Sequence, residues 1–127
     1  MLEFKNSAAT AKLPFSSSVR VGDVVYLSGC VGNVPGTQTL VSGGLDAEVR
    51  QMIANIEDAL KAHSLALCDV FKCTVMMADI SRWAEFNELY VPYFNLERMP
   101  ARSAFGTNGL ARGAQVEMEC WAYAGKA

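Results

Sequence analysis

The chain has little histidine and little charge, and both shortages narrow its possible functions. Its 127 residues include one histidine, His63, which excludes histidine-rich metal sites and any catalytic triad built on another histidine. Charged residues make up 19% of the chain, against about 25% in typical soluble domains. We therefore expect apolar surface to be buried against other copies of the chain, since closed homo-oligomers are the common way to bury it.

The sequence also lacks a basic excess, a cysteine motif and a long apolar run. Its net charge of −2 does not favour nucleic acid as a partner, because nucleic-acid-binding proteins usually carry a basic patch. The cysteines match no zinc spacing and no CxxC pair, so we expect no metal, and reduced thiols in a cytoplasmic protein. The first 18 residues predict neither a signal peptide nor a membrane span.

Hydrophobic periodicity predicts a single α+β domain over residues 1–127. The expected elements are two strands within 17–29 around Gly22-Asp23, a helix from about Asp46 (its N-cap) to His63, a strand within 69–80, a helix over about 81–94, a short strand after Pro100 and a last strand within 114–124. Pro92 should loosen the end of the second helix. Consecutive strands at both ends favour a mainly antiparallel sheet with both helices on one face.

The last strand has two different faces, because side chains alternate along a strand. Val116, Met118, Cys120 and Ala122 share the face that we expect to pack under the helices. Glu117, Glu119, Trp121 and Tyr123 share the other face. In a monomer this second face would meet water, which is the common fate of such carboxylates, and in an oligomer it would meet another sheet.

Arg102 lies in a run of small and apolar residues, Pro100 to Gly106. Two interpretations stay open for it. It is either paired inside the fold with Glu117 or Glu119, or it receives a carboxylate from outside, for which its planar, two-pronged guanidinium is well suited.

Four segments carry a family resemblance: "LPFSSSVRVGDVVYLSG", "VSGGLDAEVRQMIANIEDAL", "FKCTVMMADISRWAEFNELYVPYF" and "PARSAFG…GLARGAQVEMEC". Together, from about Leu13 to Ala124, they resemble the Rid (YjgF) family of reactive-intermediate deaminases. The most specific parts are P-x-R-S and the V-E-x-E strand, whose first glutamate follows Arg102 by fifteen residues.

The resemblance implies a fold, an assembly and a reaction. The fold is chorismate-mutase-like, in a homotrimer whose sheets face inward and whose active sites lie in clefts between subunits. The reaction is hydrolysis of 2-enamine or 2-imine acids, such as 2-aminoacrylate, 2-iminopropanoate and 2-iminobutanoate, to 2-oxo acids and ammonia. It implies no metal and no cofactor, with small 2-imino or 2-oxo acids as partners.

The resemblance also assigns roles to residues. Arg102 holds the substrate carboxylate, and Glu117 activates or orients the attacking water; Glu119, about 6–7 Å further along the strand, is the weaker candidate for a base. Ser28 and Gly29 line the cleft. Asn87 supports the residues that line the cleft. An amide on the helix surface, or one bonded to a loop, is an equal interpretation of Asn87.

The chain departs from the family pattern at three positions that would line the cleft. Phe15 stands where many members have tyrosine, Cys30 where many have glutamine, and Ala104 where a cysteine is common. Cys30 is either a reactive thiol or a buried inert one, and the absence of a histidine nearby in the sequence favours the inert thiol.

Three other functions compete with deamination. The first is a non-enzymatic module that binds small 2-oxo acids. The second is RNA cleavage with inhibition of translation, which the low content of basic residues opposes. The third is chorismate mutase activity, which a shared fold alone does not support.

Overall fold

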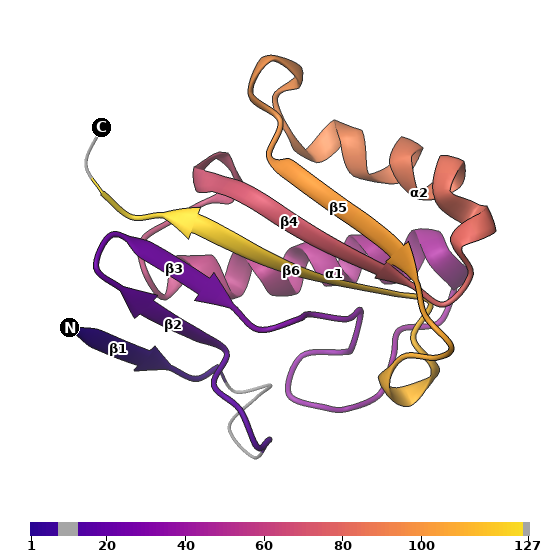
Figure 1. Cartoon of the computed structure of the whole chain (residues 1–127). Coiled ribbons are helices and arrows are strands. Elements are labelled where there is room, and N and C mark those ends of the chain that lie inside the picture. Colours follow the sequence, from indigo (N-terminus) through magenta and orange to yellow (C-terminus); the bar gives the residue numbers. More distant parts are fainter. Residues whose placement is uncertain (8–12, 126–127) are drawn as a thin grey trace.

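The fold is built around one six-stranded sheet (Figure 1). The computed structural model describes residues 1–7 and 13–125. The strands are β1 (Leu2–Lys5), β2 (Ser18–Val21), β3 (Val24–Leu27), β4 (Val70–Met77), β5 (Ala101–Gly106) and β6 (Val116–Tyr123), in the order β1-β2-β3-β6-β4-β5. Among the strands of the described residues, only β4 and β5 pair in parallel, so the expected α+β fold with a mainly antiparallel sheet is confirmed.

Two helices, α1 (Gly44–Lys61) and α2 (Trp83–Tyr90), pack on the same core, and α1 runs behind the sheet in Figure 1. The buried residues of α1 recur at helical spacing and include Val49, Met52, Ile53 and Ile56. The inward residues of β6 are fully buried, whereas Glu117, Glu119 and Trp121 are half-buried and Tyr123 is exposed. The two predicted faces of the last strand are therefore confirmed.

The first helix begins earlier than expected, and the predicted N-cap is wrong. Gly43 is the N-cap, with φ of 121°, and no side chain caps the helix. The Gly43-Gly44 pair permits this turn because glycine tolerates positive φ. Asp46 instead lies in the first turn, where its carboxylate pairs with Arg50 at 2.8 Å.

The second helix is shorter than predicted. Single 3₁₀ turns, Ile80–Arg82 and Val91–Tyr93, flank its regular part. Asp79 caps the first turn by accepting a hydrogen bond from the Ser81 N–H at 3.0 Å. The α-helix changes to a 3₁₀ turn at the residues around Pro92, which confirms that this proline loosens the end of the helix.

Strand β1 was not predicted from the sequence. It pairs antiparallel with β2, from Leu2 opposite Val21 to Lys5 opposite Ser18. Leu2 and Phe4 remain 60% and 57% exposed, so the strand buries little apolar surface within the chain. Its apolar and charged residues alternate, but over only four positions, which is too short a run to predict a strand with certainty from the sequence.

Candidate active site

Arg102 lies on the edge strand β5, and its side chain packs against α2. Its Nη2 atom donates a hydrogen bond to Oδ1 of Asn87 at 2.7 Å. The Cζ atom lies 5.0 Å from the ring centroid of Trp83, 5.7 Å from that of Phe86 and 4.8 Å from that of Tyr90. These distances fall within the range of cation–π attraction.

One face of α2 supplies all four of these contacts. Trp83, Phe86, Asn87 and Tyr90 are spaced at i, i+3, i+4 and i+7, which places them on a single side of a helix. We call these four residues the Arg102 cradle. Asn87 therefore has a specific contact, and the helix-surface interpretation of this amide is wrong. The aromatic members were not predicted as site residues, although their spacing in the sequence was a usable signal.

Arg102 has no carboxylate within 4.0 Å among the described residues. The arginine ion pairs there join Arg20 to Asp23, Arg50 to Asp46, and Arg82 to Glu85. The interpretation of Arg102 as an internal partner of Glu117 or Glu119 is therefore wrong. The guanidinium is held by aromatic rings and one amide, so it can still accept a carboxylate.

Glu117 points away from Arg102. Arg102 pairs with Cys73, and Cys73 pairs with Cys120, so these three side chains share the helix-covered face. Glu117 is three residues before Cys120 and faces the other side. Two strand spacings and three residues of strand separate the Cα atoms of Arg102 and Glu117 by about 14 Å. Within one chain, no small acid can contact both side chains.

Glu117 instead lies against the segment that follows β3. A Cβ atom at Gly29 would overlap Oε2 of Glu117, so a larger residue there would displace the carboxylate from its present position. The neighbouring segment is held in place because the Cys30 N–H donates to the Met118 carbonyl at 2.8 Å. The Ser28 hydroxyl donates to the Ser16 carbonyl at 2.6 Å. Gly29, one of the residues expected to line the cleft, thus lies beside Glu117 within one chain.

The electrostatic surroundings of Glu117 favour its protonated form. Burial raises the pKa of the Glu117 carboxyl above its usual value, and the Glu119 carboxylate raises it further. The Arg112 guanidinium acts in the opposite direction and lowers this pKa. A carboxyl with a raised pKa is better matched to proton transfer near neutral pH.

Arg112 is a site residue that sequence reasoning missed. It lies in the turn Ala111–Gly113, just before β6, with φ of 60°. Non-glycine residues seldom adopt this conformation, and they often do so at functional sites. Its signal in the sequence was a cation five residues before Glu117.

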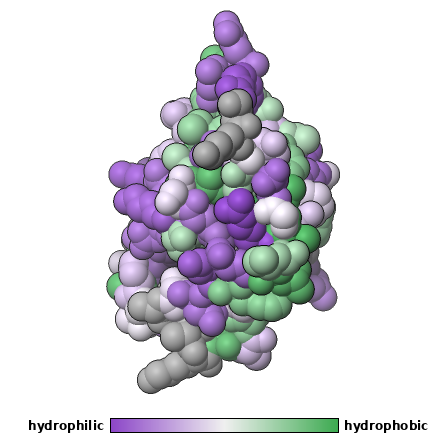
Figure 2. All heavy atoms as spheres, turned by 90° about the vertical axis from the view of Figure 1, so that its left-hand side faces the viewer, coloured by the Kyte–Doolittle hydropathy of each residue, from purple (hydrophilic) through white to green (hydrophobic). Residues whose placement is uncertain are grey.

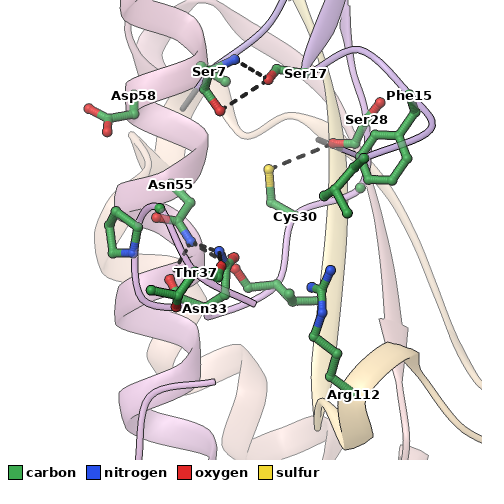
Figure 3. Close-up of a pocket in the computed structure, with 16 residues that line it drawn as sticks. Ser7, Phe15, Ser17, Ser28, Cys30, Asn33, Thr37, Asn55, Asp58 and Arg112 are labelled. Carbon is green, nitrogen blue, oxygen red and sulfur yellow. Dashed lines mark hydrogen bonds between the residues drawn. The ribbon is translucent and has the colours of Figure 1, made fainter. Parts of the chain in front are cut away.

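A cavity of about 130 Å³ lies beside this group (Figure 3). Four of the expected site residues line it, namely Phe15, Ser28, Gly29 and Cys30. Burial, followed by the nearby Glu117, raises the pKa of the Cys30 thiol to about 12. The inert-thiol interpretation of Cys30 is therefore supported.

The expected site residues thus form two separate groups. The first comprises Arg102, Asn87 and Ala104, which is half-buried on the same face of β5 as Arg102. The second surrounds Glu117 and the cavity.

No cluster of three or more metal-ligating side chains occurs in residues 1–7 and 13–125. No helix in the described part of the chain is long and apolar enough to span a membrane.

Comparisons with known proteins identify the family of this chain. A human protein named 2-iminobutanoate/2-iminopropanoate deaminase is 38% identical over 112 residues, which cover 88% of this chain and 81% of that protein. The crystal structure of RidA from the Antarctic bacterium Psychrobacter sp. matches with a TM-score of 0.87 and 33% identity, over 95% of this chain and 98% of that one. The Escherichia coli YjgF structure matches with a TM-score of 0.83 and 25% identity, over 95% and 98% of the two chains. The family model described as Endoribonuclease L-PSP matches residues 5–124, and the chain therefore belongs to the Rid (YjgF) family.

Proposed function

We propose that this protein hydrolyses 2-imino acids, and the 2-enamine acids from which they form, to 2-oxo acids and ammonia. The names of the human and other mammalian relatives support this reaction class. The observation that carries the proposal is the Arg102 cradle, because it presents a guanidinium that lacks a carboxylate partner among the described residues. The substrates of the proposed reaction all supply that carboxylate.

Glu117 is the proposed base in this reaction. A water molecule attacks C2 of the imine, the carbon–nitrogen bond breaks, and nitrogen leaves as ammonia while the water oxygen becomes the 2-oxo group. The raised pKa of Glu117 suits a carboxyl that takes a proton from water and passes it to the departing nitrogen. Positioning the carboxylate and the water supplies much of the remaining acceleration, so the reaction needs no cofactor.

We further propose that each active site is shared by two subunits of a homotrimer with a chorismate-mutase-like fold, each chain forming a single domain. The separation of about 14 Å between Arg102 and Glu117 supports sharing, since a second copy can supply the missing half. The open face of the sheet supports assembly, because Tyr26, Trp121 and Tyr123 leave aromatic surface uncovered there. Apolar residues gather on the right of Figure 2, the side that corresponds to the front of Figure 1.

The proposed partners are small 2-imino and 2-oxo acids and further copies of this chain. We propose the cytoplasm as the compartment, because Cys30, Cys68, Cys73 and Cys120 are all free thiols and reduced thiols are typical of that compartment.

The decisive experiment generates 2-iminopropanoate from serine with a dehydratase, in the presence of semicarbazide. The wild-type protein should divert imine from the semicarbazone to pyruvate and ammonia, and Arg102→Ala should lose this effect. If the wild-type protein binds pyruvate but does not accelerate ammonia release, it is a binding module and not an enzyme. RNA cleavage that persists in wild type but not in Arg102→Ala, without deamination, would favour the RNA-cleaving alternative.

A further inference from the structure

Two cysteines lie directly opposite each other on neighbouring strands of the sheet. Cys73 of β4 pairs with Cys120 of β6 in the antiparallel register, and both side chains are fully buried. Their Sγ atoms are 3.7 Å apart, so that one thiol donates a hydrogen bond to the other. Opposed residues of antiparallel strands have Cα atoms about 4.5 or 5.5 Å apart, and a disulfide spans either distance. The backbone therefore has the spacing that a bond between these sulfurs requires.

Arg102 lies on the other side of Cys73. Strand β4 runs between β5 and β6 (Figure 1), and Cys73 is paired with Arg102 as well as with Cys120. The three side chains form a row on the helix-covered face, with Cys73 in the centre. A neighbouring guanidinium favours the thiolate, which is the reactive form of cysteine. Cys73 is therefore the member of the pair that should react first.

The electrostatic surroundings of the two thiols differ. The hydrogen bond with Cys120 lowers the pKa of the Cys73 thiol, and the positive charge of Arg102 also lowers it, whereas burial acts in the opposite direction. The same hydrogen bond and burial raise the pKa of the Cys120 thiol. Burial makes most thiols inert, as it does at Cys30. Cys73 differs from Cys30 because it has a cation and a second thiol beside it.

We propose that Cys73 and Cys120 are a redox-sensitive pair that hydroperoxides convert to a disulfide, and that a carboxylate held by Arg102 slows this conversion. The first part depends on the two thiols, and the second rests on the proposed carboxylate-binding role of Arg102. A bound carboxylate cancels the charge that favours the Cys73 thiolate. A protein whose site is filled is thereby protected, and an empty one is open to oxidation.

The oxidation takes place in two steps. The Cys73 thiolate attacks one oxygen of the hydroperoxide, so that a sulfur–oxygen bond forms, the oxygen–oxygen bond breaks, and the departing alkoxide takes a proton to become an alcohol. Cys120 then attacks the resulting sulfenic sulfur. The disulfide forms, the sulfur–oxygen bond breaks, and the hydroxyl leaves with the Cys120 proton as water. The two thiols lose two electrons, which reduce the peroxide to alcohol and water.

The first test treats the reduced wild-type protein with hydrogen peroxide and then alkylates the remaining thiols under denaturing conditions. Mass spectrometry should show that two of the four thiols escape alkylation, and peptide mapping should find Cys73 linked to Cys120. Dithiothreitol should reverse the change. Cys120→Ala should instead leave a sulfenic acid at Cys73, which dimedone traps. Cys68→Ser removes an exposed thiol and should keep the disulfide. A wild-type protein that forms no such link would overturn the proposal, whether or not the variants fold.

The second test measures the rate of disulfide formation with and without propanoate, a carboxylate that does not consume peroxide. Saturating propanoate should slow the wild-type protein several-fold, since a rise of one unit in the pKa of a mostly protonated thiol lowers its rate about threefold. Arg102→Met keeps most of the volume without the charge and should be slow in both conditions. Arg102→Lys, which keeps the charge, should be faster than Arg102→Met.

The outcomes of the second test separate this inference from the proposed function. If Arg102→Met is slow but propanoate leaves the wild-type rate unchanged, Arg102 does not bind carboxylates. The deaminase proposal then loses its main support, while the redox pair stands. If wild type and both Arg102 variants are oxidised equally fast, the coupling of the pair to Arg102 is wrong.

Discussion

At the scale of single residues, Arg102 should contribute to ligand binding more than to stability. Charge-assisted hydrogen bonds contribute about 1.5–3 kcal/mol each, so Arg102→Ala should weaken pyruvate binding by about tenfold or more. Arg102→Lys should recover only part of this loss, because an ammonium lacks the two-pronged geometry. Calorimetric titration measures both effects. Arg50→Ala, which removes an exposed arginine on α1, should bind pyruvate as wild type does; an early-melting Arg102→Ala with unchanged binding would contradict the assignment.

Arg112 should set the pH at which Glu117 becomes active. Burial and Glu119 raise the pKa of Glu117, while Arg112 lowers it, so Arg112→Gln should raise this pKa further. The base form of Glu117 is lost as pH falls through its pKa. The acid limb of the kcat/KM profile should therefore move to higher pH in Arg112→Gln. The same substrate is used throughout, so its own titration cancels in the comparison.

Arg112→Lys is the matched control, because it keeps the positive charge. Its acid limb should stay closer to that of wild type than the limb of Arg112→Gln does. A limb that does not move, or that moves to lower pH, would show that Arg112 does not act on the catalytic carboxyl.

At the scale of elements, α2 should position Arg102 through its aromatic face. Cation–π contacts contribute about 0.5–2 kcal/mol, so Trp83→Leu should weaken 2-oxo acid binding several-fold and raise KM, with little change in kcat. Trp83→Phe should restore part of the affinity, since a ring remains over the guanidinium. Leu96→Ala, which alters another exposed apolar residue, is the control and should behave as wild type. A Trp83→Leu variant with lowered kcat and unchanged KM would contradict a positioning role.

How well the sequence predicted each element depended on how much apolar surface that element buries. The spacing of Val49, Met52 and Ile56 predicted α1 because that stripe enters the core. The missed strand β1 buries little, and it is held by its backbone pairing with β2. The beginning of α1 was missed because backbone freedom at Gly43, not a capping side chain, decides where the helix begins.

At the scale of the whole molecule, the family resemblance identified Arg102 and Glu117, but local patterns could not predict their separation. That separation depends on β4 lying between β5 and β6, a pairing of segments that are distant in the sequence. Arg112 and the Arg102 cradle were missed for a similar reason. Only the folded structure shows that the turn at Arg112 acts on Glu117 and that α2 lies beside Arg102.

Shared sites predict a specific result for mixed assemblies. Arg102→Ala and Glu117→Gln should each be nearly inactive alone. In a cyclic trimer that mixes the two chains, one interface joins an intact Arg102 to an intact Glu117. Random mixing in equal amounts should therefore restore about a quarter of wild-type activity, since about three quarters of such trimers are mixed and each has one intact site in three. Activity is measured after co-refolding.

The control for this experiment combines the same two preparations without refolding, which should give no recovery until subunits exchange. Light scattering of the refolded sample should give the mass of three chains. Recovery that stays at the sum of the two parents, or a monomeric mass at micromolar concentration, would rule out the shared site.

The Arg102 cradle has a consequence for the end of the catalytic cycle. The carboxylate that Arg102 is proposed to hold is the part of the substrate that hydrolysis leaves unchanged, so Arg102, held by the cradle, binds substrate and product with similar strength. Such uniform binding lowers KM without raising kcat. Ammonia, which Arg102 does not hold, should leave first and the 2-oxo acid last. Accumulated 2-oxo acid should therefore compete with fresh imine for the free protein, so that turnover slows as product builds up and recovers when a second enzyme removes it.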